Sequence, residues 1–253
     1  MSVYKIHPIV VGTKIFDKGM MTYQHGYGQP YTIPIYSWYL EGGDRKVLVD
    51  TGELKPIQSE SREEAIGGKI HTFEEGLDRW GLKPEDIDVV IHTHLHSDHC
   101  ENDYKCTNAQ IHVHEKELET IHAPHPLDFR YVEDFIFDVE DNGQIRKVTG
   151  DGEILPGISV VHSPAHTPGG ISVLIDTPEG RAVITGFCII LENLYPPREI
   201  RAMEMEVIPP GTHVNAYEAY DILLKTKKLA KIVIPLHEPK FAAMETITGP
   251  VTS

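Results

Sequence analysis

The chain has 253 residues, 40% of them hydrophobic and 24% charged, which is ordinary for a globular protein and allows one large domain or two small ones. Its formal net charge of −15 and the lack of any Lys or Arg cluster argue against binding to a nucleic acid. No apolar stretch is long enough to cross a membrane, the first residues lack the pattern of a secretory signal, and the three cysteines match no disulfide framework, so we expect a cytoplasmic protein with no membrane partner.

The N-terminal part of the chain is strand-like and is followed by helical patterns. Strands are expected at 5–11, 31–40 and 46–49, and helices at 63–66 and 73–80. The strands are separated by glycine-rich turns, which favours antiparallel pairing. The third strand is apolar and ends at Asp50-Thr51-Gly52. A carboxylate at the end of a buried strand can orient a nearby ligand histidine, and the competing interpretation is a simple Asx turn.

The next apolar run, 89–91, is typical of a buried strand, and it ends in a cluster of candidate metal ligands. In an extended chain, side chains two residues apart share a face, so His94 and His96 can converge on one ion. A turn of the backbone then lets Asp98 and His99 aim at a second point nearby. Imidazole and carboxylate suit Zn²⁺, and also Mn²⁺ or Fe²⁺. A chance cluster would pack these polar groups together without a partner, so the sequence predicts two divalent metal ions here.

The segment after this cluster is expected to form a strand at 109–113 and a helix at 115–121. His112 and His114 share one face of that strand, but no further ligand follows at a suitable spacing, so we do not expect them to bind metal. The stretch 123–141 mixes prolines, aromatic residues and acids. Such an insertion is either a lid over a site or a subunit contact, and a subunit contact would make the protein a homodimer.

The second half of the chain returns to strands. They are expected at 158–162, 171–175, 182–185 and 231–235, together with a helix at 215–230. Two prolines and two glycines fix the loop around His166, where a third ligand for the first ion would be needed. Cys188 follows the third of these strands, and His237 follows the last. The candidate ligands therefore lie at several strand ends, which can meet at one edge of a layered sheet.

These motifs resemble the metallo-β-lactamase superfamily. The resemblance spans nearly the whole chain and rests on His94-Leu-His96-Ser-Asp98-His99, the loop around His166, the lone His237 and the turn Asp50-Thr51-Gly52. Within the superfamily, residues 33–40 and 150–157 are most similar to N-acyl homoserine lactonases. The resemblance implies an α+β fold, a four-layer αβ/βα sandwich that residues 1–253 form as a single domain, with a dinuclear metal site at one edge of its two sheets.

The resemblance also implies how the metal ions are held. The first ion would be bound by His94, His96 and His166, and the second by Asp98, His99 and His237. Counting from His166 puts Cys188 where the family has a bridging aspartate, and a thiolate can also bridge two zinc ions. The alternative is a buried structural cysteine with a weakened or empty second site. The lactonases also have a tyrosine that binds the substrate carbonyl, but Leu191 stands at that position, which leaves the role to Tyr195.

The resemblance and the candidate ligands together predict a hydrolase that opens a lactone or a related small-molecule ester. Two metal ions that share a water lower its pKa, and the metal-bound hydroxide would attack the carbonyl while Asp98 passes a proton to the leaving alkoxide. A glyoxalase-II-like thioesterase is one alternative, although the sequence shows no basic patch for an acidic thiol carrier. A non-catalytic metal-binding or redox protein with an altered site is the other.

Overall fold

Residues 2–251, the part of the chain that the computed structural model describes, form two β-sheets that pack against each other. The first has the strand order β1-β2-β3-β4-β5-β6 and the second has the order β11-β10-β9-β8-β7. The first sheet contains β1 (Lys5–Asp17), β2 (Pro30–Glu41), β3 (Val47–Val49), β4 (Val89–Ile91), β5 (Gln110–His114) and β6 (Ile145–Val148). The second contains β7 (Gly152–Leu155), β8 (Ile158–His162), β9 (Ile171–Thr177), β10 (Gly180–Ile184) and β11 (Ile232–Ile234).

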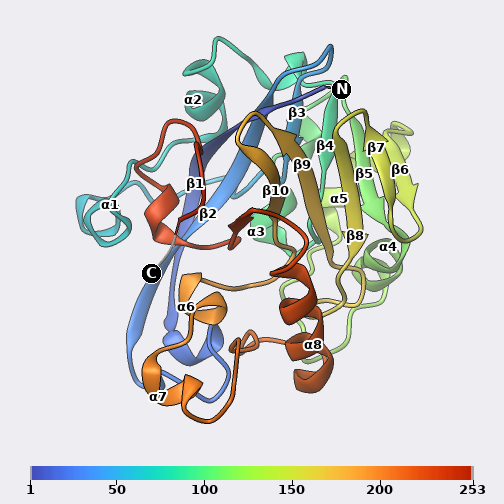
Figure 1. The fold of residues 1–253 in the computed structure, drawn as a ribbon. Helices are drawn as coiled ribbons and strands as arrows, with labels where there is room; N and C mark the ends of the chain where they lie inside the picture. Colours follow the sequence, from blue (N-terminus) through green and yellow to red (C-terminus); the bar gives the residue numbers. More distant parts are fainter. Residues whose placement is uncertain (1, 252–253) are drawn as a thin grey trace.

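The helices follow the strands in short connections. They are α1 (Glu60–Ile66), α2 (Phe73–Asp78), α3 (Ser97–Cys100), α4 (Glu115–His122), α5 (Asp134–Asp141), α6 (Leu191–Leu194), α7 (Arg198–Arg201) and α8 (Ala216–Thr226). Figure 1 shows the yellow and orange strands of the second sheet lying over the green strands of the first. No helix in this described part of the chain combines the length and apolar character needed to cross a membrane.

The alternation of side chains along the strands places the main core between the two sheets. In β10, Ala182 and Ile184 belong to this core, whereas Val183 lies on the opposite face. The core also holds Trp38 and Tyr36 of β2, which are among the largest fully buried side chains. Both faces of the central strands are apolar because each sheet is covered on both sides.

Helices cover the two outer faces. Phe73 of α2, Leu118 of α4 and Ile136 of α5 pack on the outer face of the first sheet. Ala219 and Leu223 of α8 pack on the outer face of the second sheet. The layers therefore run helix, sheet, sheet, helix, and the predicted αβ/βα sandwich is confirmed.

Most predicted elements occur close to their expected bounds, and two strands were missed. The strand predicted at 158–162 is β8, whereas the first strand continues to Asp17 because β2 pairs with it along its whole length. The missed strands, β6 and β7, each have four residues and expose about half of their side chains. Short strands of this kind lack the apolar alternation from which a strand can be predicted.

The stretch 123–141, expected to be a lid or a subunit contact, consists of two different parts. Its second part is α5, in which Ile136 and Val139 are buried against the first sheet. This part therefore belongs to the core rather than to a lid. The first part is a loop that brings Phe129 and Arg130 to the edge of the sandwich where the candidate ligands lie.

The turn after β3 approaches this edge through close packing. Asp50 and Gly52 have positive φ angles of 58° and 72°, and a Cβ atom on Gly52 would lie 1.9 Å from Cγ2 of Val11. Only glycine fits there without displacing β1. Thr51 N donates to His99 O at 2.8 Å, so this turn is joined directly to α3.

Candidate metal centre

The candidate ligands come together at one edge of the two sheets. His94 and His96 lie in the loop after β4, Asp98 and His99 in α3, His166 in the loop between β8 and β9, Cys188 in the segment after β10, and His237 just after β11. All of them line one cavity of about 90 Å³. The rest of the lining consists of Phe16, Met20, Met21, Ile33, Phe129, Arg130 and Thr212.

Buried hydrogen bonds set the path of the loop after β4. Thr93 donates to the Asp50 carboxylate from its backbone N at 2.8 Å and from its Oγ1 at 2.7 Å. Leu95 N donates to Oε2 of Glu117 at 2.9 Å. Nδ1 of His99 lies 2.9 Å from the same Asp50 carboxylate. Asp50 therefore orients His99, which is one of the two interpretations that the sequence left open for this residue.

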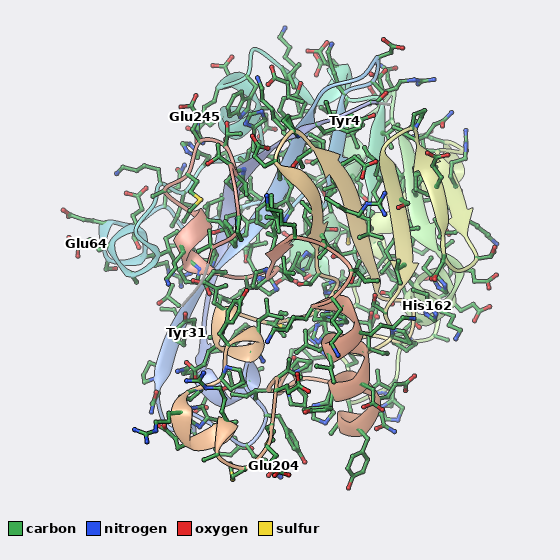
Figure 2. The ribbon with its side chains drawn as sticks, viewed as in Figure 1. Tyr4, Tyr31, Glu64, His162, Glu204 and Glu245 are labelled. Atoms are coloured by element: carbon green, nitrogen blue, oxygen red, sulfur yellow. The ribbon has the colours of Figure 1, made fainter. Side chains whose placement is uncertain are left out.

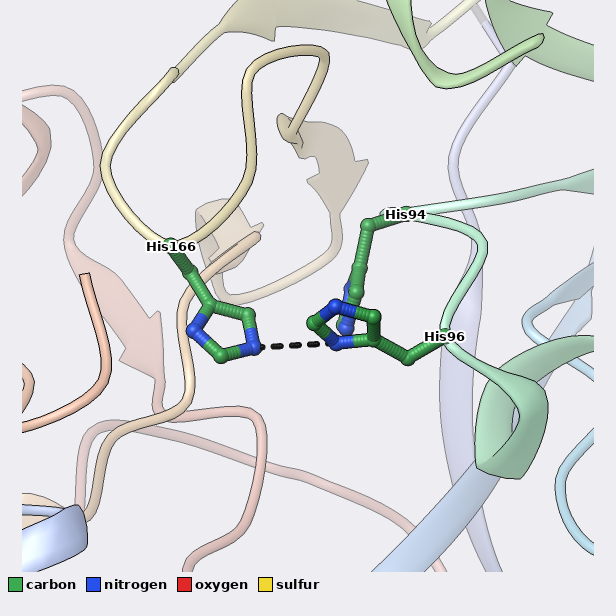
Figure 3. Close-up of side chains that lie close together, drawn as sticks. All are labelled: His94, His96 and His166. Atoms are coloured by element: carbon green, nitrogen blue, oxygen red, sulfur yellow. Dashed lines mark hydrogen bonds between the residues drawn. The ribbon is translucent and has the colours of Figure 1, made fainter. Parts of the chain in front are cut away.

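Three of the histidines form a compact group. Donor nitrogens of His94, His96 and His166 all lie within 4.8 Å of one another, and all three residues are buried. Figure 3 shows the His166 ring facing those of His94 and His96 across the cavity, with a dashed line between His96 and His166. That line joins Nδ1 of His96 to Nε2 of His166, which are 3.2 Å apart.

The hydrogen bonds of these two rings decide where their protons are. Nε2 of His96 lies 3.2 Å from Oδ2 of Asp128, and Nδ1 of His166 lies 2.8 Å from the carbonyl oxygen of Thr212. Both partners are acceptors, so in a neutral imidazole the proton sits on these outer nitrogens. The two nitrogens that face each other then both present lone pairs at 3.2 Å. Two facing lone pairs repel unless a cation lies between them, so this arrangement fits a metal ion.

The other histidines are held in the same way. Nδ1 of His94 lies 3.0 Å from Oγ1 of Thr93, and Nδ1 of His237 lies 3.0 Å from the carbonyl oxygen of Pro34. Together with the bond from His99 to Asp50, these contacts use Nδ1 of each ring, and Nε2 of each ring makes no hydrogen bond within residues 2–251. A histidine whose outer nitrogen is bound in this way has a fixed orientation, with its other nitrogen directed at the cavity.

Burial makes most of these rings neutral at ordinary pH. Burial, followed by the neighbouring His99 and His96 rings, lowers the pKa of His94 well below 6.5. Burial is also the largest cause that lowers the pKa of His166, and the pKa of His237 falls to about 4. Burial would lower the pKa of His99 as well, but the Asp50 and Asp98 carboxylates outweigh it and raise that pKa. Neutral imidazole is the form that binds metal.

A second group of candidate ligands lies beside the first. Nε2 of His99 lies 3.9 Å from Oδ1 of Asp98, and the ring centroids of His99 and His237 are 5.3 Å apart. The His94 and His99 rings are 4.2 Å apart, so the two groups share a border. Among residues 2–251, the first group alone contains three possible ligand atoms that all lie within 4.8 Å of one another. The first group is thus the more closely assembled of the two.

Cys188 lines the same cavity as both groups. Its Sγ lies 3.7 Å from Sδ of Met21, and burial, followed by the negative charge of Asp98, raises the pKa of this thiol to about 12. The sulfur therefore lies at the site, protonated in the metal-free protein. A bound cation stabilises the thiolate and would reverse this shift.

Tyr195 does not reach the cavity, so the expectation that it acts there is not supported. It follows α6 and packs with Leu194 and α8, with the Lys227 ammonium 5.0 Å from the centre of its ring. The chain turns into α6 directly after Ile190, and this turn directs Tyr195 into a neighbouring groove. No tyrosine of the described residues lines the cavity.

Sequence reasoning missed several residues that support the site. His92 lies buried between two carboxylates, 3.3 Å from Asp50 and 2.8 Å from Asp103. Asp128 and Thr212, which hold His96 and His166, lie in loops without any motif. His92 alone had a local signal, because it adjoins the ligand cluster.

His112 and His114 of β5 are not among the residues that line the cavity. His114 stacks on His162, which Figure 2 labels near the end of β8, with the ring centroids 4.2 Å apart and the planes at 4°. This contact joins β5 of the first sheet to β8 of the second. It is a packing contact between the two sheets.

The amino-acid sequence is similar to those of known proteins. The family model of the metallo-beta-lactamase superfamily matches residues 31–186. An N-acyl homoserine lactonase of Bacillus sp is 30% identical over 199 residues, which cover 73% of this chain and 75% of the relative. A probable metallo-hydrolase of Methanocaldococcus jannaschii is 33% identical over 163 residues, covering 64% of this chain and 63% of the relative.

Solved structures resemble the whole fold. An N-acyl homoserine lactone hydrolase, solved with the product N-hexanoyl-L-homoserine at its catalytic metal centre, has a TM-score of 0.70 and 23% identity, covering 94% of both chains. AidC, a dizinc quorum-quenching lactonase, has a TM-score of 0.67 and 13% identity, covering 100% of this chain and 99% of its own. At these identities the likeness establishes a shared fold.

Replacing Asp50 with asparagine should weaken metal binding. The Asn side chain keeps one acceptor oxygen for the several donors that now share the carboxylate, and it loses the charge that polarises His99. We expect Asp50→Asn to reduce zinc affinity about 10- to 100-fold, measured by competition with a chelating dye. Asp78→Asn, an exposed change on α2, serves as the control. Equal affinity in both variants would contradict the role of Asp50.

The metal-free protein should be most stable near pH 6.5. The pKa of His237 is about 4 in the folded chain, below its ordinary value of 6.5. Between these two values the unfolded chain binds a proton that the folded chain does not, so the free energy of unfolding decreases as the pH falls. Burial would lower the pKa of His92, but the Asp103 and Asp50 carboxylates outweigh burial and raise this pKa to about 10. The charged His92 ring therefore stabilises the fold fully below pH 6.5, and this stabilisation is lost as the pH rises toward 10. Urea unfolding midpoints measured from about pH 5 to about pH 9 should therefore pass through a maximum.

The variant His92→Gln tests which histidine causes the alkaline decline. It removes the ring that becomes neutral as pH rises, so its midpoint should change less than that of the unaltered chain above pH 6.5. A parallel decline in both proteins would assign the alkaline effect to other groups.

Proposed function

The chain belongs to the metallo-beta-lactamase superfamily and is an ester-hydrolysing metallo-enzyme, and we propose that its substrate is a lactone similar to the N-acyl homoserine lactones. The observation that carries the metal-dependent part of this proposal is that Nδ1 of His96 and Nε2 of His166 face each other at 3.2 Å while the other nitrogen of each ring contacts an acceptor. The lactone part is supported by the 30% identity to a lactonase over most of both chains.

We further propose that the cavity binds two divalent ions, with zinc as the best match to these donors. In this assignment His94, His96 and His166 hold the first ion, and Asp98, His99 and His237 hold the second. The imidazole-rich ligand set favours zinc over magnesium or calcium. When bound, such ions supply a water of lowered pKa and a Lewis acid for the ester carbonyl.

Asp98 is the candidate for proton transfer during hydrolysis. Burial would raise its pKa, but the adjacent His99 and His237 rings lower it, so the group is a carboxylate at neutral pH. Its side chain is 18% exposed and lines the cavity, so it can contact a bound substrate. We assign it to accept a proton from the attacking water and to deliver it to the alkoxide that leaves when the lactone opens.

The fixed shape of the cavity supports this chemistry. Its histidines are oriented by acceptors from β2, the loop before α5 and the segment before α8. Phe16, Ile33, Met20 and Met21 add apolar surface beside the polar group, which limits the water that reaches it. An apolar wall next to fixed polar groups is the usual form of a small-molecule site.

Removing a ligand of the first group should abolish both metal binding and hydrolysis. Both His166→Ala and His94→Ala leave two of the three ligands of the first group, and a two-ligand site holds zinc weakly. We expect zinc content and lactone hydrolysis to fall together, measured by elemental analysis and by acid release from a γ-lactone. His122→Ala, an exposed change on α4, is the control. Full hydrolysis by the chelated, metal-depleted protein would contradict the proposal.

Replacing Cys188 tests whether its sulfur bridges the two ions, as we propose. Cys188→Ala should keep the first ion and lose most of the second, so the content falls from about two ions per chain to about one. Cys188→Asp should restore the second ion, because a carboxylate can also bridge. Cys106→Ala, a buried cysteine away from the cavity, is the matched control. Two ions retained in Cys188→Ala would show that the cysteine is structural.

A further inference from the structure

One permanent positive charge lines the cavity. Among the described residues that form its wall, Arg130 is the only Arg or Lys. Its side chain is 30% exposed, so the guanidinium is accessible to solvent and to small molecules. Arg130 lines this cavity together with His96 and His166, so its charge lies beside the candidate ligands.

Arg130 is held in place at two points. Its Nε donates to Oδ1 of Asp128 at 2.7 Å, and the other oxygen of Asp128 holds His96. Its carbonyl oxygen accepts a hydrogen bond from Ser97 N at 2.9 Å, at the start of α3. The guanidinium is therefore fixed relative to both groups of candidate ligands.

The next residue fixes the loop from the other side. Tyr131 is buried, its hydroxyl donates to Oε2 of Glu117 at 2.9 Å, and its ring packs on His96 at 4.7 Å. The same Glu117 oxygen accepts from Leu95 N in the ligand loop. The loop that carries Arg130 is thus joined through Glu117 to the loop that carries His94 and His96, and this connection fixes the position of the Arg130 loop.

The terminal nitrogens of Arg130 are unused. Within residues 2–251 its Nε bond to Asp128 is its only side-chain hydrogen bond, and Nη1 and Nη2 have no partner. A guanidinium fork forms strong paired hydrogen bonds with a carboxylate or a carbonyl oxygen. A purely structural role explains the bond at Nε but leaves the terminal fork without a function.

The cavity offers few other donors to a substrate. The hydroxyl of Thr212 is already bound to His166 and the carbonyl of Met20, and Tyr195 lies in another groove. The remaining walls are apolar or consist of the candidate ligands. A polar substituent of the substrate would therefore meet Arg130.

We propose that Arg130 is a specificity-determining residue whose terminal nitrogens bind an oxygen of the substituent next to the scissile ester. The chain then favours lactones that carry a carbonyl or carboxylate oxygen at that position over lactones that lack one. This inference rests on the proposed lactone hydrolysis and names the substrate feature that the site selects.

The test compares three γ-lactones with the zinc-loaded protein: one without a substituent, one with an α-acylamino group and one with an α-carboxylate. The variant Arg130→Met removes the guanidinium and keeps an unbranched apolar side chain. We expect it to lower kcat/KM for the favoured substituted lactone, relative to the unsubstituted lactone, about tenfold or more. Arg146→Met, which removes an exposed arginine on β6, should leave the ratio unchanged.

The ratio separates binding from structural effects. Loss of the Arg130 to Asp128 bond can disturb His96 and slow all three lactones equally, but it cannot change their ratio. Loss confined to the α-carboxylate lactone assigns an anionic substrate, and loss confined to the α-acylamino lactone assigns a neutral carbonyl. An unchanged ratio in Arg130→Met overturns the inference alone. No turnover of any lactone by the zinc-loaded, unaltered chain overturns the proposed function as well.

Discussion

The buried carboxylate of Asp50 is the interaction on which the rest of the site depends. It accepts hydrogen bonds from Thr93 N and Oγ1 and from the His99 and His92 rings, at distances from 2.7 to 3.3 Å. A carboxylate without these partners would be costly to bury. Burial would raise the pKa of Asp50, but His99 and His92 lower it, so the group stays charged. The end of β3 is thereby fixed to the loop after β4 and to α3.

The charge of Asp50 is partly compensated within the same buried network. His92 bridges Asp50 to Asp103, and Oγ1 of Thr51 donates to Asp103 at 2.7 Å. A protonated His92 between two carboxylates leaves one net negative charge beside His99. That charge favours a cation on the far side of the His99 ring, where the cavity lies. The supporting network thus shapes the electrostatics of the cavity as well as its geometry.

The sequence could predict the candidate ligands because they carry local signals. Residues 94–99 form a dense motif after an apolar strand, and His166 lies in a loop that prolines and glycines make rigid. The acceptors that hold them carry no such signal: Asp128 lies in an irregular loop, and His237 and His166 bind backbone carbonyls that any residue could provide. The sequence placed Tyr195 in the cavity, where it does not lie, for a related reason. Counting along the chain gave its distance from Cys188 but not the turn into α6 that directs it toward Lys227.

The proposed role of Cys188 connects the different states of the two ligand groups. The first group is already assembled with neutral imidazoles, so it can bind an ion without losing a proton. The proposed bridge differs, because burial and Asp98 raise the pKa of the Cys188 thiol to about 12. An ion bound by the first group would bring positive charge beside this thiol and would lower its pKa, so the thiolate would form only after that ion had bound. The two sites would then fill in order, with a proton released at the second step, and the soft thiolate would favour zinc over manganese there.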